Sequence, residues 1–317
     1  MRNRTPDKLH PDAAPERIGV IDIGTNSVKL LVAGPDLVPA HFERRTTRLG
    51  RGMTRSHRIR SKPLADTIAT LQEFARAARR RGARDVFAFA TWAMRGAAGA
   101  HKALATLEKQ SGVPVRVLSG REEARFGYLS ARAHLPRPRP WTLVCDVGGG
   151  STELVLARSG KVVATTSKPL GALHLTERFI DTDPIDADQF AHLSRHVEST
   201  VRRWLNARPD IPASALDLVV SGGSVTTLAA MLSGSYPGEN MVRLGPLRDL
   251  QRHCLGLTTE ARKSIPGLAP DRADIIPAGI AVVLAIMEAS GKRILRVNDG
   301  GVREGALIHL LGNNLEW

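Results

Sequence analysis

The chain has 317 residues, of which 42% are hydrophobic, and a formal net charge of +14. A chain of this length can bury two separate cores, so we expect two domains. Its two cysteines, Cys145 and Cys254, are too few for a disulfide framework, and their spacing fits no metal site. No apolar run reaches the length of a membrane span, and residues 1–17 carry no secretory signal, so we expect a cytoplasmic protein without a membrane partner.

The excess of 45 Lys and Arg over 31 Asp and Glu indicates a polyanionic partner. Nucleic acid, long polyphosphate and anionic nucleotides all fit the charge alone, as does a solvated basic surface. The chain has only 4 Trp, 2 Tyr and 7 Phe, and none is interleaved with the basic clusters as a base-stacking platform requires. Nucleic acid is therefore the least favoured partner. The oligomeric state is left open, a homodimer included.

Residues 1–17 show no periodicity and are predicted to form a flexible tail. Two β-branched runs follow, and the short segment 24–27 between them predicts a β-hairpin. Beyond it, helical patterns alternate with short apolar runs, which is typical of an α/β layer. The first half is predicted to contain strands at 18–23 and 28–33, a helix at 63–81, a strand at 86–90, a helix at 100–111, a strand at 113–118 and a helix at 120–133.

The second half begins as the first does, after a proline-rich connector at 135–140. The strand–loop–strand unit Asp22-Ile-Gly-Thr-Asn-Ser27 matches Asp146-Val-Gly-Gly-Gly-Ser151 in its pattern of residues. This duplication is the most informative structural feature of the sequence. The remaining predicted elements are strands at 142–147 and 153–157, a helix at 186–205, a strand at 216–221, a loop at 222–224, a helical segment that follows Arg272 and runs to Ser290, a strand at 294–297 and a helix at 303–311.

The duplicated loops have the composition of phosphate-binding loops. Glycines let backbone N–H groups converge on phosphate oxygens, and Ser, Thr and Asn add donors without bulk. An aspartate would repel phosphate, so Asp22 and Asp146, which end the preceding strands, are better suited to hold a cation such as Mg²⁺. The candidate phosphate-binding residues are Gly24, Thr25, Asn26 and Ser27 in the first loop, Gly148, Gly149, Gly150 and Ser151 in the second, and Ser221, Gly222, Gly223 and Ser224 in a third.

Hydrolysis of a phosphoanhydride also needs a base that orients water. Glu122 and Glu123 begin a predicted helix, where the helix dipole alone would also favour two carboxylates. Spacing does not choose between these roles. Arg95, just after the strand at 86–90, is a candidate phosphate clamp, with a plain surface arginine as the alternative.

From residue 18 to 312 the chain resembles the Ppx/GppA family of exopolyphosphatases and guanosine pentaphosphate phosphohydrolases, within the actin-like ATPase superfamily. No single motif is decisive, but eight occur in the order of the family. They are Ile21-Asp-Ile-Gly-Thr-Asn-Ser-Val-Lys-Leu-Leu-Val32, Ala90-Thr-Trp-Ala-Met-Arg95, Ser119-Gly-Arg-Glu-Glu-Ala-Arg125, Asp146-Val-Gly-Gly-Gly-Ser-Thr-Glu153, Leu170-Gly-Ala-Leu-His-Leu-Thr-Glu177, Ser221-Gly-Gly-Ser-Val-Thr-Thr-Leu228, Ile265-Pro-Gly-Leu-Ala-Pro-Asp-Arg-Ala-Asp274 and Val302-Arg-Glu-Gly305.

The resemblance implies a role for each matched residue. Glu123 would be the general base that activates the attacking water. Asn26, Ser27, Arg95, the second loop and Arg272 would hold phosphate. Asp146 and Glu153 would lie near Mg²⁺, with Mn²⁺ as an alternative cation. Segment 96–99, which has no polar side chain here, departs from the family pattern and is not expected to contact substrate.

The fold that the resemblance implies is α/β, with two actin-like (ribonuclease H-like) domains and a cleft between them. Domain I would span 18–125 together with the C-terminal helix 302–317, and domain II 126–301. The chain would be a short, two-domain exopolyphosphatase that removes terminal phosphate from inorganic polyphosphate. The arginine-rich segments 44–60 and 76–84 would guide the polymer. The alternatives are a guanosine pentaphosphate (pppGpp) 5′-phosphohydrolase, a polyphosphate-dependent phosphotransferase and a non-catalytic polyanion binder.

Overall fold

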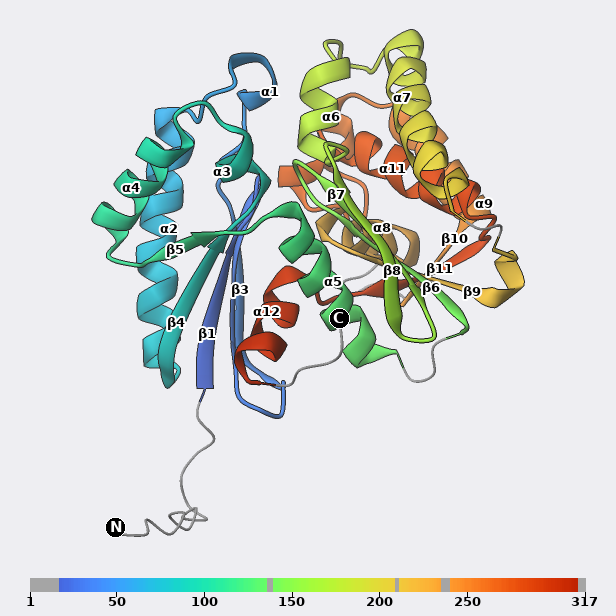
Figure 1. The fold of residues 1–317 in the computed structure, drawn as a ribbon. Coiled ribbons are helices and arrows are strands. Elements are labelled where there is room, and N and C mark those ends of the chain that lie inside the picture. Colours follow the sequence, from blue (N-terminus) through green and yellow to red (C-terminus); the bar gives the residue numbers. More distant parts are fainter. Residues whose placement is uncertain (1–16, 136–138, 209–210, 235–239, 313–317) are drawn as a thin grey trace, which may run out of the picture.

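A computed structural model describes residues 17–135, 139–208, 211–234 and 240–312. The predicted tail at 1–17 therefore lies outside the described residues, apart from Arg17. Two β-sheets form two lobes that stand side by side, with helices between them and on their outer faces (Figure 1). The predicted α/β class is confirmed. Among the described helices, none is long and apolar enough to cross a membrane.

The first lobe is built on a five-stranded sheet in the order β3-β2-β1-β4-β5. β1 pairs antiparallel with β2, and β2 with β3, whereas β4 lies parallel to β1 and β5 parallel to β4. Helices α2 and α4 pack on one face of this sheet (Figure 1). The bounds in this lobe are β1 Arg17–Ile23, β2 Ser27–Ala33, β3 Pro39–Thr46, α1 Met53–Ser56, α2 Ser61–Arg80, β4 Ala83–Ala90, α3 Trp92–Gly96, α4 Ala100–Ser111 and β5 Val115–Val117.

The second lobe is built on a six-stranded sheet in the order β10-β11-β9-β6-β7-β8. Its hairpin β6–β7 is the counterpart of β1–β2, and β9 lies parallel to β6 as β4 does to β1. The bounds are β6 Trp141–Val147, β7 Thr152–Arg158, β8 Lys161–Lys168, α6 Ala172–Phe179, α7 Ala187–Asn206, β9 Leu216–Ser221, α8 Gly223–Ser233, β10 Met241–Arg243, α9 Leu244–Leu255, α10 Thr259–Arg262, α11 Ile276–Ala289 and β11 Ile294–Asn298, with 3₁₀ turns at Ala213–Ala215 and Pro270–Arg272.

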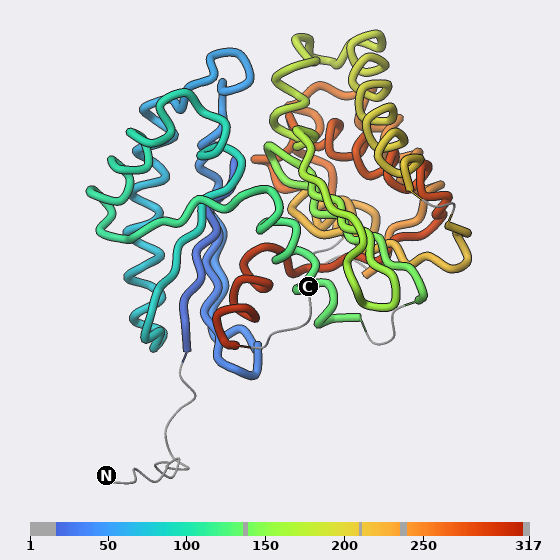
Figure 2. The backbone as a smooth tube through the Cα atoms, in the orientation of Figure 1, coloured from blue at the N-terminus to red at the C-terminus, as the bar shows by residue number. Residues whose placement is uncertain are grey.

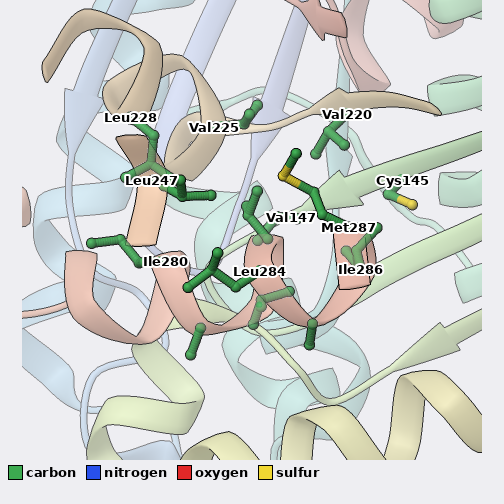
Figure 3. Packing of buried hydrophobic residues seen from close by; sticks show 14 of the residues in the cluster. Cys145, Val147, Val220, Val225, Leu228, Leu247, Ile280, Leu284, Ile286 and Met287 are labelled. Carbon is green, nitrogen blue, oxygen red and sulfur yellow. The ribbon is translucent and has the colours of Figure 1, made fainter. Parts of the chain in front are cut away.

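Helix α11 is the centre of the largest core. All of its residues from Ile276 to Met287 are buried, because its sequence is apolar on every side and offers no polar face to water. Its Ile280, Leu284 and Met287 pack among side chains of β6, β9 and α8 (Figure 3). This core holds β6, β9 and α8 in place relative to one another.

Helices α5 (Gly120–His134) and α12 (Val302–Leu310) lie between the two sheets, as the backbone trace also shows (Figure 2). Phe126 and Leu129 of α5 pack with the first sheet and α12, whereas Ala124 and Tyr128 pack on β6, β7 and β9 of the second. Successive residues of α5 thus face different lobes. The predicted domain boundary at 125/126 falls inside this helix, and the domain limits stay a prediction.

The predicted elements agree with the structure where local patterns are strong. The helix at 100–111 and the strand at 216–221 have the predicted bounds. The predicted loop at 222–224 is instead the start of α8, which begins at Gly223. The helical segment predicted to follow Arg272 is α11, which begins at Ile276 and ends at Ala289, so its start lies a few residues later than predicted.

Candidate active site

A cavity of about 540 Å³ opens between the lobes, where β1 and β6 end. The β1–β2 loop and the β6–β7 loop face each other across it. They approach so closely that a Cβ atom on Gly149 would lie 3.0 Å from Asn26 Cβ, and one on Gly150 would lie 2.6 Å from Thr25 Oγ1. Larger residues at these two positions would push the lobes apart.

The two loops have the same turn geometry, as their duplicated sequences predict. Gly24 N–H donates to Ser27 O at 3.0 Å, and Gly148 N–H donates to Ser151 O, also at 3.0 Å. Asn26 is buried, yet neither its side-chain nitrogen nor its oxygen has a hydrogen-bond partner. Buried polar atoms are nearly always paired, so the side-chain amide of Asn26 has a donor and an acceptor available for a ligand in the cavity.

The N-terminus of α8 forms a third wall. Gly222 precedes the helix with a φ of 102°, and a Cβ there would overlap the carbonyl group of Val147. Glycine is therefore required for β9 to turn into the helix beside β6. Gly222, Gly223 and Ser224 all line the cavity. The free N–H groups of a first helical turn are suited to an anion.

Four carboxylates converge on the cavity: Asp22, Glu123, Asp146 and Glu153. Burial is the largest influence on each, and it raises the pKa of all four above the usual range for these side chains. For Glu153 the pKa rises to about 7, with the charge of nearby Asp146 as the second cause. Ser167 Oγ holds Glu153 by donating to its Oε1 at 2.7 Å.

Glu122 and Glu123 have different surroundings, although both lie in the first turn of α5. Glu122 forms a capping box with Ser119, accepting the Ser119 N–H at 2.8 Å. Glu123 is only 4% exposed, faces the cavity and forms an ion pair with Arg95. Burial and the nearby Glu153 hold the pKa of Glu123 well above its usual range, and Arg95 opposes this shift.

The carboxylates suit a divalent cation that also contacts substrate. Among the described residues, no three His, Cys, Asp or Glu side chains form a ready-made metal cage. Mg²⁺ commonly takes only one or two carboxylates and fills its other positions with water and phosphate oxygens. Asp22 Oδ1 is buried without a hydrogen-bond partner, so it is a free hard ligand. The predicted cation-side residues Asp22, Asp146 and Glu153 therefore fit such a cation.

Most predicted site residues are brought together here. All twelve residues predicted in the three loops line the cavity except Ser221, whose hydroxyl group is buried and donates to Cys145 O at 3.3 Å. Arg272 lines it as well. Arg95 does not; it donates to Leu118 O at 2.7 Å and pairs with Glu123. The phosphate-binding roles of Arg95 and Ser221 stay predictions.

Several lining residues were not predicted from the sequence. Lys29 of β2 lies 3.7 Å from Asp22, and Phe42 and Arg44 come from β3. Asp299 comes from the loop between β11 and α12, and Arg303 comes from the first turn of α12. Lys29 lies inside a quoted motif, but its place in a strand gave no sign that it faces the cavity. Arg303 also lies inside a quoted motif, and Arg44 lies in the arginine-rich segment 44–60, but neither was predicted to line the site. Phe42 and Asp299 depend on long-range pairing that no local pattern reveals.

Hydrogen bonds tie the lobes together around the cavity. Gly52 N–H donates to Glu177 Oε1 at 2.6 Å, and Thr54 Oγ1 lies 3.0 Å from His174 Nδ1. On another side, Arg48 binds both carboxylate oxygens of Asp274, at 2.6 and 2.7 Å. The two lobes are therefore in direct contact on at least two sides of the cavity.

A two-lobed α/β protein with a phosphate-suited, carboxylate-lined cleft has counterparts among known proteins. Residues 29–314 match the Ppx/GppA phosphatase family. Exopolyphosphatase 1 of Mycobacterium tuberculosis is 29% identical over 316 residues, covering 95% of this chain and 90% of that protein. Exopolyphosphatase 2 of the same organism is 30% identical, covering 93% of this chain and 99% of that protein.

Solved structures agree. A Ppx/GppA family member from Aquifex aeolicus, 29% identical, superposes with a TM-score of 0.76 over 95% of this chain and 99% of its own. An exopolyphosphatase from Cytophaga hutchinsonii, 22% identical, shares the fold with a TM-score of 0.85 over 94% of this chain and 98% of its own. The predicted fold of two actin-like units is confirmed. The chain belongs to the Ppx/GppA phosphatase family.

Proposed function

We propose that the protein is an exopolyphosphatase, which hydrolyses the terminal phosphoanhydride bond of inorganic polyphosphate. The observation that carries this proposal is the position of Glu123, a buried carboxylate that faces a cavity walled by two matched glycine loops. Relatives that match nearly the whole chain are named exopolyphosphatases. The basic composition suits a polyanionic substrate.

The loops would position the terminal phosphate. Backbone N–H groups of the glycines, with the side chains of Asn26, Ser27 and Ser151, would hold its oxygens from both lobes. Glu123 would accept a proton from the water molecule that attacks phosphorus in line with the leaving oxygen. The P–O bond to the chain breaks, and the products are orthophosphate and a polymer shorter by one phosphate.

The environment of Glu123 suits this role. A base that works near neutral pH benefits from a pKa near that pH, and burial raises the pKa of this carboxyl group from its ordinary range. Arg95 limits the rise and fixes the side chain by its ion pair. Arg95 would then be a positioning residue rather than a phosphate ligand.

The family is generally dependent on a divalent cation. We propose Mg²⁺, with Mn²⁺ as an alternative, held by Asp22, Asp146 and Glu153. Such a cation neutralises charge on the phosphate oxygens when bound. The predicted cytoplasmic location and the oligomeric state stay predictions.

The test is phosphate release by the purified protein from long-chain polyphosphate and, separately, from pppGpp, with Mg²⁺ or with excess chelator. We expect orthophosphate from polyphosphate at a higher kcat/KM than from pppGpp, and loss of both activities in chelator. Preferred conversion of pppGpp to the tetraphosphate would make the protein a pppGpp phosphohydrolase instead. ATP formation on addition of ADP would make it a phosphotransferase, and binding of polyphosphate without any turnover would leave a polyanion binder.

A further inference from the structure

A row of ionic side chains crosses the first sheet from the buried carboxylates to its edge. Asp22 of β1 is directly opposite Lys29 of β2, and Lys29 is directly opposite Arg44 of β3. Directly opposite residues point to the same face of a sheet, and neighbouring strands lie about 4.8 Å apart. The row therefore runs from Asp22 on β1 through Lys29 on β2 to Arg44 on β3, the edge strand of the sheet.

An aromatic residue and a further arginine extend this row. Phe42 lies two residues before Arg44 on β3, so it shares the same face, and its side chain is 45% exposed. The guanidinium carbon of Arg303, from the first turn of α12, lies 4.5 Å from the centre of the Phe42 ring. All four side chains line the cavity, and we call Lys29, Phe42, Arg44 and Arg303 the basic rim.

The arginines of the rim keep unused hydrogen-bond donors. Arg44 Nη2 lies 3.4 Å from Asp271, a long contact, and the Arg44 side chain is 29% exposed. Arg303 Nε lies 2.7 Å from Glu304 Oε1. Arg303 Nη2 also donates to Asp299 O at 3.4 Å, another long contact. A guanidinium group has five N–H donors, so these contacts leave several donors for phosphate oxygens. Two acidic residues lie beside the rim and line the cavity: Asp22, 3.7 Å from Lys29 Nζ, and Asp299.

Other predicted arginines do not reach the site. Arg45 pairs with Glu73, and Arg48 is held by Asp274. Segment 76–84 lies at the far end of the sheet, because Ala83 pairs with Arg17 at the start of β1 whereas the cavity lies beyond Ile23. Six residues of strand separate the two ends by roughly 20 Å. Only Arg44 of the two arginine-rich segments lines the cavity.

We propose that the basic rim is a second phosphate subsite, which holds the phosphates that follow the terminal one and thereby sets the preference for long polymer. This rests on the proposed exopolyphosphatase function. The carboxylates and the glycine loops would hold the terminal phosphate inside the cavity. The remaining phosphates of the polymer therefore have to pass along the wall of the cavity on their way to solvent. The rim offers that path three basic side chains that line the cavity, those of Lys29, Arg44 and Arg303. Phe42 supports the guanidinium group of Arg303 by a cation–π contact.

The test compares Arg44→Gln, Arg303→Gln and the double variant with wild type on long-chain polyphosphate and on tripolyphosphate. We expect KM for the long polymer to rise about tenfold for each arginine, as loss of one charge-assisted contact predicts. KM for tripolyphosphate should rise by a smaller factor, because fewer of its phosphates reach the rim. Arg303→Lys, which keeps the charge, should recover part of the loss. Arg79→Gln, an exposed arginine at the far end of α2, is the control and should leave KM unchanged.

Equal rises in KM for both substrates, or no rise for the long polymer, would overturn the proposal. If Phe42→Ala raised KM for pppGpp and left KM for polyphosphate unchanged, the rim would be a platform for a nucleobase instead. Thermal unfolding of each variant separates misfolding from lost affinity. Absence of orthophosphate release from polyphosphate by wild type would refute the proposed function. The rim would then be tested by the equilibrium affinity for long polyphosphate, which should be lower for Arg44→Gln than for wild type.

Discussion

Glu122 and Glu123 show how two adjacent, identical residues take different roles. The Glu122 side chain is committed to Ser119 at the helix N-terminus and to Arg116, and its pKa is lowered by these contacts against an opposing effect of burial. Glu123 points inward to three other carboxylates, and its pKa is raised. A proton acceptor near neutral pH needs the second environment, since a lower pKa would make the carboxylate a weaker base.

Replacing Arg95 tests its assignment as the positioning partner of Glu123. Because the arginine lowers the pKa of Glu123, Arg95→Met should raise that pKa further. The base is active when deprotonated, so the acidic limb of the kcat/KM profile should move to higher pH. Arg121→Met removes an exposed arginine two residues before Glu123 and should leave the profile in place. A uniform loss at every pH would instead favour the phosphate clamp that the sequence suggested.

At the scale of elements, α5 and α12 fix the base in space. Gly305 of α12 meets the backbone of Phe126, and a Cβ there would overlap the Phe126 carbonyl group. Phe126 follows Glu123 by one helical turn, and the helix also packs on both sheets. A small shift of α12 would therefore move the carboxylate that faces the cavity.

Gly305→Ala should destabilise the protein by about 1–3 kcal/mol, because the added methyl group has no space. It should also lower kcat, since α5 has to move. Gly245→Ala is the matched control: this glycine is also helical, in α9, and a Cβ there meets nothing within 4 Å. Its expected effect on the free energy of unfolding is neutral or stabilising. Chemical denaturation and turnover of both variants check the pair; equal stabilities would contradict the packing argument.

At the scale of the whole molecule, the lobes are joined by a few specific contacts around the cavity. Arg48 is central, because its backbone N–H donates to Asn26 O at 2.9 Å while its side chain binds Asp274 of the other lobe. The same residue thus supports a phosphate loop and holds the lobes together. If only the closed form binds substrate well, weakening this contact lowers the apparent affinity.

Arg48→Met should raise KM about tenfold and shift the lobes toward a more open average, which small-angle scattering without substrate would detect as a larger radius of gyration. Arg51→Met, an exposed arginine in the same segment, should match wild type in both measurements. Identical scattering and KM for the two variants would show that Arg48 does not hold the lobes together.

Much of the fold and part of the site are predictable because they depend on local sequence. The duplicated turns at Gly24 and Gly148 follow from their residues, and the family motif singles out Glu123. The strand β3 was missed because its pattern, with six of eight residues half-buried, resembles neither a core strand nor a clean alternation. Without β3, Phe42 was missed, and Arg44 was expected only as part of the arginine-rich segment 44–60 and not as a residue that lines the cavity. The turn into α8 was taken for a loop, because Gly-Gly-Ser has the composition of both.

The role of Glu123 in activating the attacking water can be tested by turnover of long-chain polyphosphate by Glu123→Gln beside Glu122→Gln. Both changes remove one charge from the same helical turn. The account predicts that Glu123→Gln lowers kcat by roughly 10²–10⁴-fold while still binding polyphosphate, and that Glu122→Gln stays near wild type. Substantial turnover by Glu123→Gln, or an equal loss in both variants, would contradict it.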